Sequence, residues 1–326
     1  MTVTRNRKVT ANKKSLIIGV LPKAVAVVGA TASGKTALAV ALAKEFGGEI
    51  VSADSRQLYR GTAICTDIPS GKWKSYNNHR RRAYVVEDVA HYLLGSESPG
   101  HPLTLVEYQR RAEWRLKEIS SRGRLPILVG GTGLYIRAVI DNFTGPEVAP
   151  NHDFRNRLEK HSTAKLYGRL FKVDPDYAGR ISSNNRRYIV RALEVQQVTG
   201  KPFSKQQGQG RPQFEWLQLG TDRPRNELYR RIDARVDWMA DHGLVEEAQR
   251  MFRRYGLDSR IATSLGYAQL AGVFSENCSP EEAFRLIKRD TRHYARRQLT
   301  WLRRDPRIKW IRGNSQAQGL VRRFLG

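Results

Sequence analysis

Cysteine is scarce in this sequence: among 326 residues only Cys65 and Cys278 occur, far apart along the chain. Two distant cysteines cannot build a disulfide-rich scaffold, and they lack the close spacing of a structural zinc site. This usage suits a reducing compartment, so we expect a cytoplasmic protein. No apolar run reaches the ~18 residues that cross a bilayer, so the sequence predicts no transmembrane helix and no membrane partner.

Acidic residues are also few, because 31 Asp and Glu stand against 57 Lys and Arg, which gives a net charge of +26. The first 23 residues hold six basic residues and no acidic one. That accounts for less than a quarter of the excess, so the folded body is itself basic. A polyanion is the expected partner, with nucleic acid favoured over a membrane surface. The alternative is a charge that serves only solubility.

What is present is an alternation of short apolar runs with helical patterns. Buried strands are predicted over Ala24–Val28, Glu49–Ser52 and Pro126–Val129, and helices over Thr36–Phe46 and Leu103–Ser121. Strands alternating with helices indicate a parallel α/β sheet with helices on both faces.

The pattern changes between residues 146 and 212, where apolar residues fall at helical spacing with no strand among them. We therefore predict four parts. Residues 1–22 form a disordered basic arm, 23–145 and 213–313 form the α/β core, 146–212 form a helical insertion, and 314–326 form a C-terminal tail. A strand in "EWLQLGTD" and a helix over Asn226–Asp241 return the chain to the core.

The segment "GATASGKT" follows the first predicted strand and opens the first helix. It fits the phosphate-binding pattern G-x-x-x-x-G-K-[ST], in which backbone N–H groups surround an anion at a helix N-terminus. Lys35 adds a positive charge, and the Thr36 hydroxyl is a candidate Mg²⁺ ligand. The predicted phosphate-binding residues are Gly29, Ala30, Thr31, Ala32, Ser33, Gly34, Lys35 and Thr36.

A P-loop ATPase usually carries an Asp at a strand end to help hold Mg²⁺, but here "PILVGGTG" ends its strand on Gly130 and Gly131. The acidic residue that does follow a strand is Asp54, in "SADSRQLYRG". At the carboxyl edge of a parallel sheet Asp54 would face the ligand crevice and could serve as a general base. The alternative is a helix N-cap.

Near the C-terminus, "RDTRHYARRQLTWLRRDPRIKWIRG" is dense in arginine and has few acidic residues to pair with it. Arg289, Arg292, Arg296, Thr300 and Arg303 step by three or four and so share one helical stripe. We interpret this stripe as a surface for a phosphate backbone, against the alternative of a solvated charged face. "NNRRYIVRALEV" in the insertion presents arginines in the same way.

With these residues in view, the sequence resembles the tRNA dimethylallyltransferase family, also called tRNA isopentenyltransferases, in its bacterial type. The resemblance runs from about Ala24 to Gly313. It is carried in order by "GATASGKT", "SADSRQLYRG", "LVGGTGLYIRAV", "NNRRYIVRALEVQQVTGKP", "ELYRRIDARVDWMADHGLVEEA", "SLGYAQL" and "RRQLTWLRRDPRIKWI". It implies a P-loop NTPase-like α/β fold: a parallel sheet flanked by helices, with a small all-helical insertion domain.

The resemblance also implies a reaction: a dimethylallyl group passes from dimethylallyl diphosphate, with Mg²⁺, to N6 of the adenosine immediately 3′ of the anticodon. By match to the family motifs, Asp54 is the general base, Thr132 lies beside the reacting centre, and Lys35 stabilises the leaving diphosphate. Arg231 and Arg235 are candidate diphosphate ligands, and the motif does not choose between them.

Matching segments further imply a set of contacts to the tRNA anticodon stem-loop. They are Asp54, Ser55, Arg56, Gln57, Arg155, Arg187, Tyr188, Arg191, Gly266, Tyr267, Gln269, Arg296, Arg297, Gln298, Thr300, Trp301 and Arg303. The sequence departs from the family's common "DIGTAKP" at "AICTDIPSG" and from "HHLID" at "HYLLG". These departures leave the chemical residues in place. We expect a monomer, since one stem-loop needs one site.

Three other functions compete with this interpretation. An adenylate isopentenyltransferase would share the P-loop and Asp54 but would not need a large basic surface. A P-loop small-molecule kinase would use Lys35 to bind ATP. The missing strand-end Asp and the basic C-terminus argue against a kinase. A non-enzymatic RNA-binding protein would require a decayed site, whereas Lys35, Thr36, Asp54 and Thr132 are all present.

Overall fold

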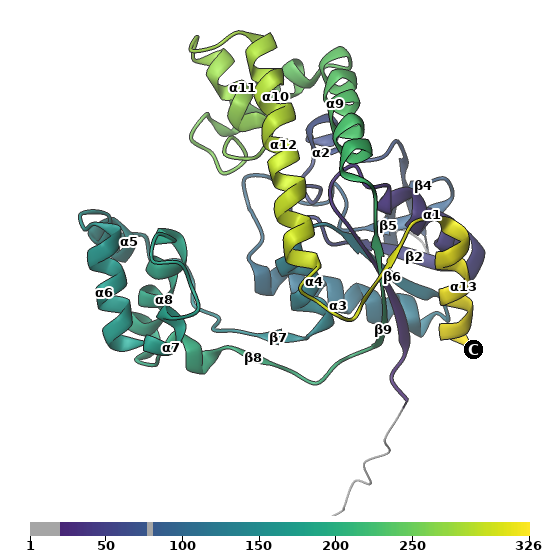
Figure 1. The fold of residues 1–326 in the computed structure, drawn as a ribbon, viewed down its shortest axis with the longest axis horizontal. Coiled ribbons are helices and arrows are strands. Elements are labelled where there is room, and N and C mark those ends of the chain that lie inside the picture. Colours follow the sequence, from purple (N-terminus) through teal and green to yellow (C-terminus); the bar gives the residue numbers. More distant parts are fainter. Residues whose placement is uncertain (1–19, 77–80) are drawn as a thin grey trace, which may run out of the picture.

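A computed structural model describes residues 20–76 and 81–326, and its centre is one eight-stranded sheet (Figure 1). The strand order is β10-β9-β1-β6-β2-β5-β4-β3, with parallel pairing from β10 to β5 and antiparallel pairing from there to β3. The strands are β1 Lys23–Val28, β2 Gly48–Ser52, β3 Lys72–Tyr76, β4 Arg81–Val86, β5 Val89–Tyr92, β6 Leu125–Gly130, β9 Glu215–Thr221 and β10 Ile308–Ile311.

Helices cover both faces of this sheet, and the longest, α12, stands beside it (Figure 1). They are α1 Lys35–Phe46, α2 Ala63–Thr66, α3 Leu105–Ser121, α4 Gly133–Ile140, α9 Arg225–Asp241, α10 Leu244–Tyr255, α11 Tyr267–Phe274, α12 Pro280–Leu302 and α13 Asn314–Leu325. None of the helices in the described part of the chain is long and apolar enough to span a membrane.

The two faces of the sheet bury two separate apolar clusters, because successive side chains of a strand point to opposite sides. In β1, Val25 and Val27 join the cluster that α1 covers, whereas Ala24, Ala26 and Val28 join the cluster that α3 covers. Every one of these five side chains is buried. The continuous apolar run that predicted a buried parallel strand thus reflects burial on both faces.

The insertion is a helical body that stands apart from the sheet and is joined to it by two short paired strands (Figure 1). Its elements are β7 Phe143–Thr144, α5 His152–Glu159, α6 Thr163–Val173, α7 Pro175–Ala178, α8 Arg186–Thr199, the 3₁₀ helix η1 Phe203–Gln206 and β8 Gly208–Gln209. Phe154, Leu170 and Ile189 belong to an apolar cluster of its own, distinct from those of the sheet. The insertion therefore has an independent core.

The structure corrects the prediction of a C-terminal tail over residues 314–326, because this segment forms α13 and packs on α1. Ala317 and Val321 are buried in the cluster that also holds Leu38 and Leu42. The helix covers apolar surface that α1 alone would leave exposed, and that burial favours docking over a free tail. The predicted disordered arm lies outside the described residues as far as residue 19.

Candidate active site

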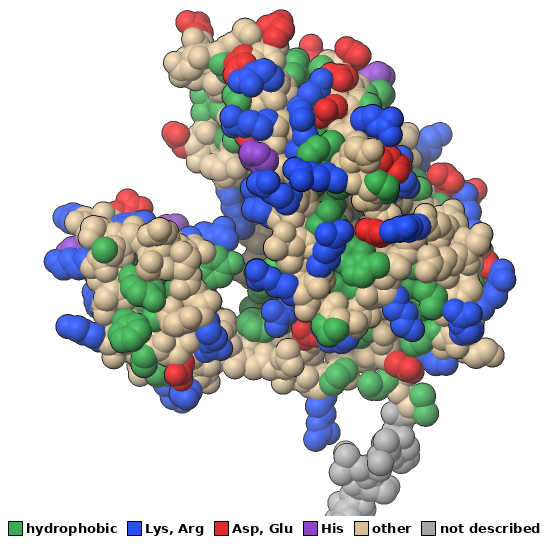
Figure 2. Space-filling view, viewed as in Figure 1, with side chains coloured by type: hydrophobic (Ala, Val, Ile, Leu, Met, Phe, Trp, Pro, Cys, Tyr) green, Lys and Arg blue, Asp and Glu red, His purple; other side chains and the backbone are tan. Residues whose placement is uncertain are grey.

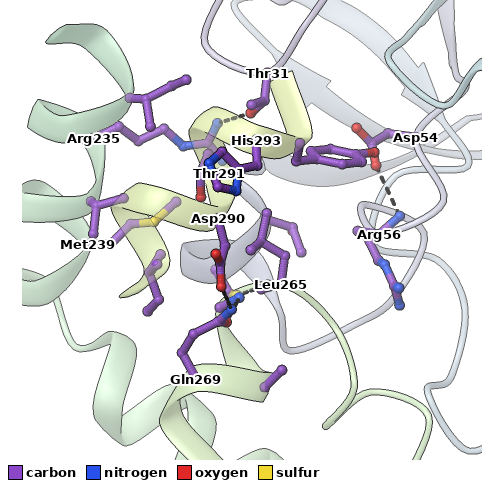
Figure 3. Close-up of a pocket in the computed structure, with 18 of the residues that line it drawn as sticks. Thr31, Asp54, Arg56, Arg235, Met239, Leu265, Gln269, Asp290, Thr291 and His293 are labelled. Atoms are coloured by element: carbon purple, nitrogen blue, oxygen red, sulfur yellow. Dashed lines mark hydrogen bonds between the residues drawn. The ribbon is translucent and has the colours of Figure 1, made fainter. Parts of the chain in front are cut away.

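A cavity of about 580 Å³ opens where the carboxyl ends of β1, β2 and β6 approach α9, α11 and α12 (Figure 3). Three predicted regions meet there: the P-loop contributes Thr31, the turn after β2 contributes Asp54, and the turn after β6 contributes Thr132. Because the carboxyl ends of parallel strands share one edge, segments far apart in the sequence converge on this point.

The P-loop has the shape that anion binding requires. Gly34 takes a left-handed conformation (φ +90°) as the N-cap of α1, where a side chain would be strained, and Lys35 is the first helical residue. Burial lowers the pKa of the Lys35 ammonium, and the nearby Asp54 carboxylate opposes that shift. Lys35 is thus a partly desolvated cation at a helix N-terminus, and this position favours binding of a phosphate group.

Three arginines from the segment after β9 contact three consecutive residues of this loop. Arg235 Nη1 donates to Thr31 Oγ1 at 2.8 Å, Arg231 Nε to the Ala32 carbonyl at 2.8 Å, and Arg223 Nε to the Ser33 carbonyl at 2.6 Å. Arg235 lines the cavity, whereas Arg231 lies on the exposed side of the loop.

Arg223 was missed by the sequence reasoning. Arg223 follows β9, which pairs with β1 and so ends beside the P-loop, and this strand order is not visible in the sequence.

Asp54 and Thr132 are held together by the backbone that follows β2 and β6. The Asp54 carboxylate accepts the Arg56 N–H at 3.0 Å, and the Thr132 hydroxyl accepts the Ser55 N–H at 3.0 Å. Gly130 lies so close to the Ala53 carbonyl that a Cβ there would overlap it. The strand end that lacks an acidic side chain thus lets the two turns touch.

Tyr294 of α12 is a further polar group on this wall that the sequence reasoning did not place in the site. Its phenol lines the cavity with Asp54 and Thr132. Burial, together with the Asp54 carboxylate, raises the pKa of Tyr294 to about 12, so the phenol remains a proton donor at neutral pH. A protonated phenol beside a carboxylate can orient a nucleobase or the carboxylate itself.

One wall of the cavity is apolar, as a pocket for a hydrocarbon group requires, while polar side chains such as Thr263, Thr291 and His293 line other parts of it. Side chains from α9, the start of α10, the segment leading to α11, and α12 form this wall; they include Ile232, Val236, Met239, Leu244, Leu265 and Ile287. Cys65 joins them, and burial raises the pKa of its thiol to about 12, so it stays a neutral thiol. The cavity therefore combines a phosphate end with an apolar wall.

Gln298 is corrected from a tRNA contact to an internal bridge. Its side chain is buried; its Oε1 accepts the Thr31 N–H at 2.9 Å, and its Nε2 donates to the Gly131 carbonyl at 2.9 Å. Both ends of the amide are used inside the protein, so Gln298 ties the P-loop to the strand end next to Thr132.

The predicted RNA contact is also wrong for the side chain of Tyr267, which is fully buried and donates its hydroxyl to Glu247 at 2.8 Å. Gly266, in contrast, lines the cavity with a left-handed backbone (φ +93°). Gln269 lines it too, donating to Asp290 at 2.8 Å (Figure 3). Gln57 donates to the carbonyls of Thr66 and Asp67, so its amide holds the end of α2.

Helix α12 carries the arginine stripe over the surface beside the cavity, where Lys and Arg side chains gather (Figure 2). Arg296, Arg297 and Thr300 are exposed, and Arg297 also lines the cavity. Arg292 and Arg303 instead have acidic partners, Asp233 at 3.2 Å and Asp222 at 3.6 Å. The stripe is therefore partly neutralised by neighbouring elements, which the sequence pattern did not reveal.

Trp301 of α12 packs against Gly133 at the start of α4, where a Cβ would overlap the indole ring. Of the predicted contacts in the insertion, Arg187 and Tyr188 are exposed, with the guanidinium 5.4 Å from the ring centroid. The insertion thus presents a cation and an aromatic ring together, a pairing suited to nucleic acid.

Arg155 and Arg191 are engaged inside the insertion by the buried Glu194. Arg155 Nε and Nη2 each lie 2.8 Å from its carboxylate, and Arg191 Nη1 lies 2.6 Å from it. Burial opposes ionisation, but these bonds and one from the Asn151 N–H together lower the pKa of Glu194 to about 2. Arg155 thus fastens α5 to α8, whereas Arg191 lies on α8 with Glu194 and also donates to the Val148 carbonyl at 2.8 Å. A role of the two arginines in binding tRNA remains a prediction.

Replacing Glu194 with Gln is expected to destabilise the insertion by about 3 kcal/mol, because two guanidiniums lose their buried counter-ion. The folded pKa lies below the ordinary value of 4.5, so the wild-type contribution is complete above pH 4.5 and is lost as pH falls toward 2. Urea unfolding and limited proteolysis of the insertion at pH 7 and pH 3.5 measure this. A variant as stable as wild type at pH 7 would contradict it.

Mg²⁺ fits this site only as an ion held largely by a diphosphate. Thr36 lies in the first turn of α1, half-buried, and its hydroxyl makes no hydrogen bond to any residue that the structure describes. Within residues 20–76 and 81–326 no group of three or more His, Cys, Asp or Glu could bind a metal ion. The Thr36 hydroxyl would hold Mg²⁺ together with phosphate oxygens and water, the oxygen ligands that this ion prefers.

A P-loop at the carboxyl edge of a parallel sheet, with a carboxylate and an apolar wall in the same cavity, defines a phosphate-binding α/β enzyme. Comparison with known proteins gives the particular family. A family model described as "IPP transferase" matches residues 57–305, and one described as "Isopentenyl transferase" matches residues 22–90. The chain belongs to the IPP transferase family.

Relatives named tRNA dimethylallyltransferase are similar to this chain over most of their length. The chain is 44% identical to a tRNA dimethylallyltransferase of Thermomicrobium roseum over 292 residues, which are 88% of this chain and 85% of that protein. It is 41% identical to the tRNA dimethylallyltransferase of Geobacillus thermodenitrificans over 295 residues, 89% of this chain and 90% of that protein.

Solved structures agree with the fold. The tRNA isopentenylpyrophosphate transferase of Bacillus halodurans is 33% identical, with a TM-score of 0.65, over 93% of this chain and 95% of that one. A eukaryotic dimethylallyltransferase acting on tRNA is 25% identical, with a TM-score of 0.70, over 86% of this chain and 70% of that one.

Proposed function

We propose that this enzyme transfers the dimethylallyl group of dimethylallyl diphosphate to N6 of the adenosine immediately 3′ of the anticodon in tRNA. The observation that carries the proposal is the single cavity that joins the P-loop and Arg235 to Asp54, Thr132 and an apolar wall, beside the basic helix α12. The membership in the IPP transferase family and the tRNA-modifying relatives support the same reaction.

The chemistry fits the arrangement of groups. The bond between the allylic carbon and the diphosphate oxygen breaks, a bond from that carbon to N6 forms, and Asp54 takes the proton that leaves N6. Lys35, the loop N–H groups and Arg235 stabilise the charge that gathers on the diphosphate. Mg²⁺ held by Thr36 and the diphosphate would neutralise part of that charge. The apolar wall keeps water from the electron-poor allylic carbon.

The acceptor must reach Asp54, so the adenine has to leave its stack in the anticodon loop. Arg187 of the insertion and Arg296 and Arg297 of α12 are exposed cations, and they suit the backbone of a stem-loop. We place the reaction in the cytoplasm and expect a monomer that binds one anticodon stem-loop.

The test is transfer of label from dimethylallyl diphosphate to unmodified tRNA by the purified protein with Mg²⁺. We expect labelled tRNA, with the label on the adenosine 3′ of the anticodon after digestion to nucleosides. Labelling of AMP but not of tRNA would instead establish an adenylate isopentenyltransferase. Consumption of ATP with a small alcohol acceptor would establish a kinase.

A further inference from the structure

An acidic residue that the proposed reaction does not use lies next to Arg235, at the diphosphate end of the cavity. Asp67 Oδ2 lies 3.2 Å from Arg235 Nη1, the same nitrogen that donates to Thr31 Oγ1. The Nε of Arg235 is buried and has no hydrogen-bond partner among the described residues. Burial lowers the pKa of this guanidinium, and Asp67 is the largest opposing influence. Arg235 is thus a desolvated cation with one carboxylate partner and unused hydrogen-bonding capacity.

The fold fixes the position of Asp67 from both sides of the four-residue helix α2. At its start, the buried carboxylate of Glu247 accepts the N–H groups of Ile64 and Cys65 at 2.8 and 2.9 Å. At its end, Gln57 Nε2 donates to the carbonyls of Thr66 and Asp67 at 2.9 and 3.1 Å. Asp67 itself has a left-handed backbone (φ +55°) that few side chains tolerate, Asp and Asn among them.

Arg235 and Asp67 have opposite charges and therefore opposite effects on the binding of diphosphate. The Arg235 side chain is 18% exposed and that of Asp67 is 53% exposed, so the carboxylate keeps contact with water while it orients a largely buried cation. When a diphosphate occupies the P-loop, Arg235 gains a second anionic partner. The guanidinium of Arg235 then lies between the diphosphate and the Asp67 carboxylate. Like charges so placed repel and weaken the binding of the anion.

We propose that Asp67 is a positioning residue of the donor site, which holds Arg235 against the P-loop and at the same time weakens the grip on diphosphate so that the product leaves. This inference rests on the proposed function, because it takes the diphosphate to be both part of the donor and the released product. Asp67 does not touch the reacting atoms and acts through Arg235.

The test compares Asp67→Asn with Asp67→Ala. Asn keeps an acceptor for Arg235 but removes the charge, so binding of magnesium diphosphate to Asp67→Asn is expected to tighten about three- to tenfold, as for one partly screened charge. Ala removes the acceptor as well, so the single-turnover rate of transfer is expected to fall about tenfold in Asp67→Ala and to recover in Asp67→Asn. Calorimetry measures the binding and labelled donor measures the rate.

Asp88→Asn is the matched control, because Asp88 also has a left-handed backbone (φ 65°) but lies 95% exposed at the turn between β4 and β5. Diphosphate binding in Asp67→Asn that equals the control, or is weaker, would overturn the proposal, as would equal rates in the Ala and Asn variants. Wild-type protein that binds magnesium diphosphate but labels no tRNA would refute the proposed function. Labelled tRNA together with unchanged diphosphate binding in Asp67→Asn would refute this inference alone.

Discussion

Asp54→Asn is expected to lower the single-turnover rate of dimethylallyl transfer by about 10²–10⁴-fold, the usual contribution of a general base. The adenine amine is a weak nucleophile, and its proton must leave as the new bond forms. An amide cannot accept that proton. It can still accept the Arg56 N–H that the Asp54 carboxylate now accepts at 3.0 Å, so the turn after β2 remains intact.

This substitution separates chemistry from binding. Filter binding of tRNA to Asp54→Asn is expected to stay within about threefold of wild type, because the basic surfaces of α12 and the insertion are untouched. Asp54→Ala serves as the comparison variant, because it removes both the base and the acceptor of the Arg56 N–H. Equal losses of rate and of tRNA affinity in Asp54→Asn would show that Asp54 shapes the site and is not the base.

Lys35→Met is expected to lower kcat/KM for dimethylallyl diphosphate by about 10²–10³-fold, because the leaving diphosphate loses a preorganised cation. Met has a similar length and keeps the packing of the side chain. Lys44→Met is the matched control: Lys44 lies at the other end of α1, exposed, and pairs with Glu87 at 2.7 Å. Steady-state kinetics at saturating tRNA measure both variants, and similar values for the two would contradict the assignment.

The lowered pKa of Lys35 adds a signature in pH. The protonated ammonium binds diphosphate, so the KM of wild-type enzyme for the donor should rise as pH increases through that lowered pKa, and Lys35→Met should lose this rise. Protonation of Lys35 has the opposite effect on the free energy of unfolding, which it lowers. The unfolded chain binds the proton more tightly, so a charged Lys35 costs stability below its folded pKa and the cost disappears toward pH 10.5. Lys35→Met is therefore expected to raise the Tm at neutral pH.

The local pattern of apolar residues and glycines predicted much of the fold. Continuous apolar runs predicted β1, β2 and β6 because both faces of these strands are buried, and the P-loop glycines fixed the turn into α1. Within the eight-stranded sheet, four strands were not predicted, β3, β4, β5 and β10, and they lie toward its two edges. The edge strand β3 has five exposed or half-exposed residues and so lacks a distinct apolar period. β5 is fully buried, but it is only four residues long and includes His91, so no apolar run marked it.

The sequence by itself determined the groups to which we assign the chemistry, because Lys35, Thr36, Asp54 and Thr132 stand in motifs whose backbone geometry is local. Only the tertiary structure decided which other side chains reach them. Tyr267 and Gln298 belong to segments that match RNA-contacting motifs, yet they face inward, since a helix shows its partners only once it is packed. Arg223 and Asp67 reach the P-loop and Arg235 because strand order and the seating of α2 set distances between residues remote in the chain.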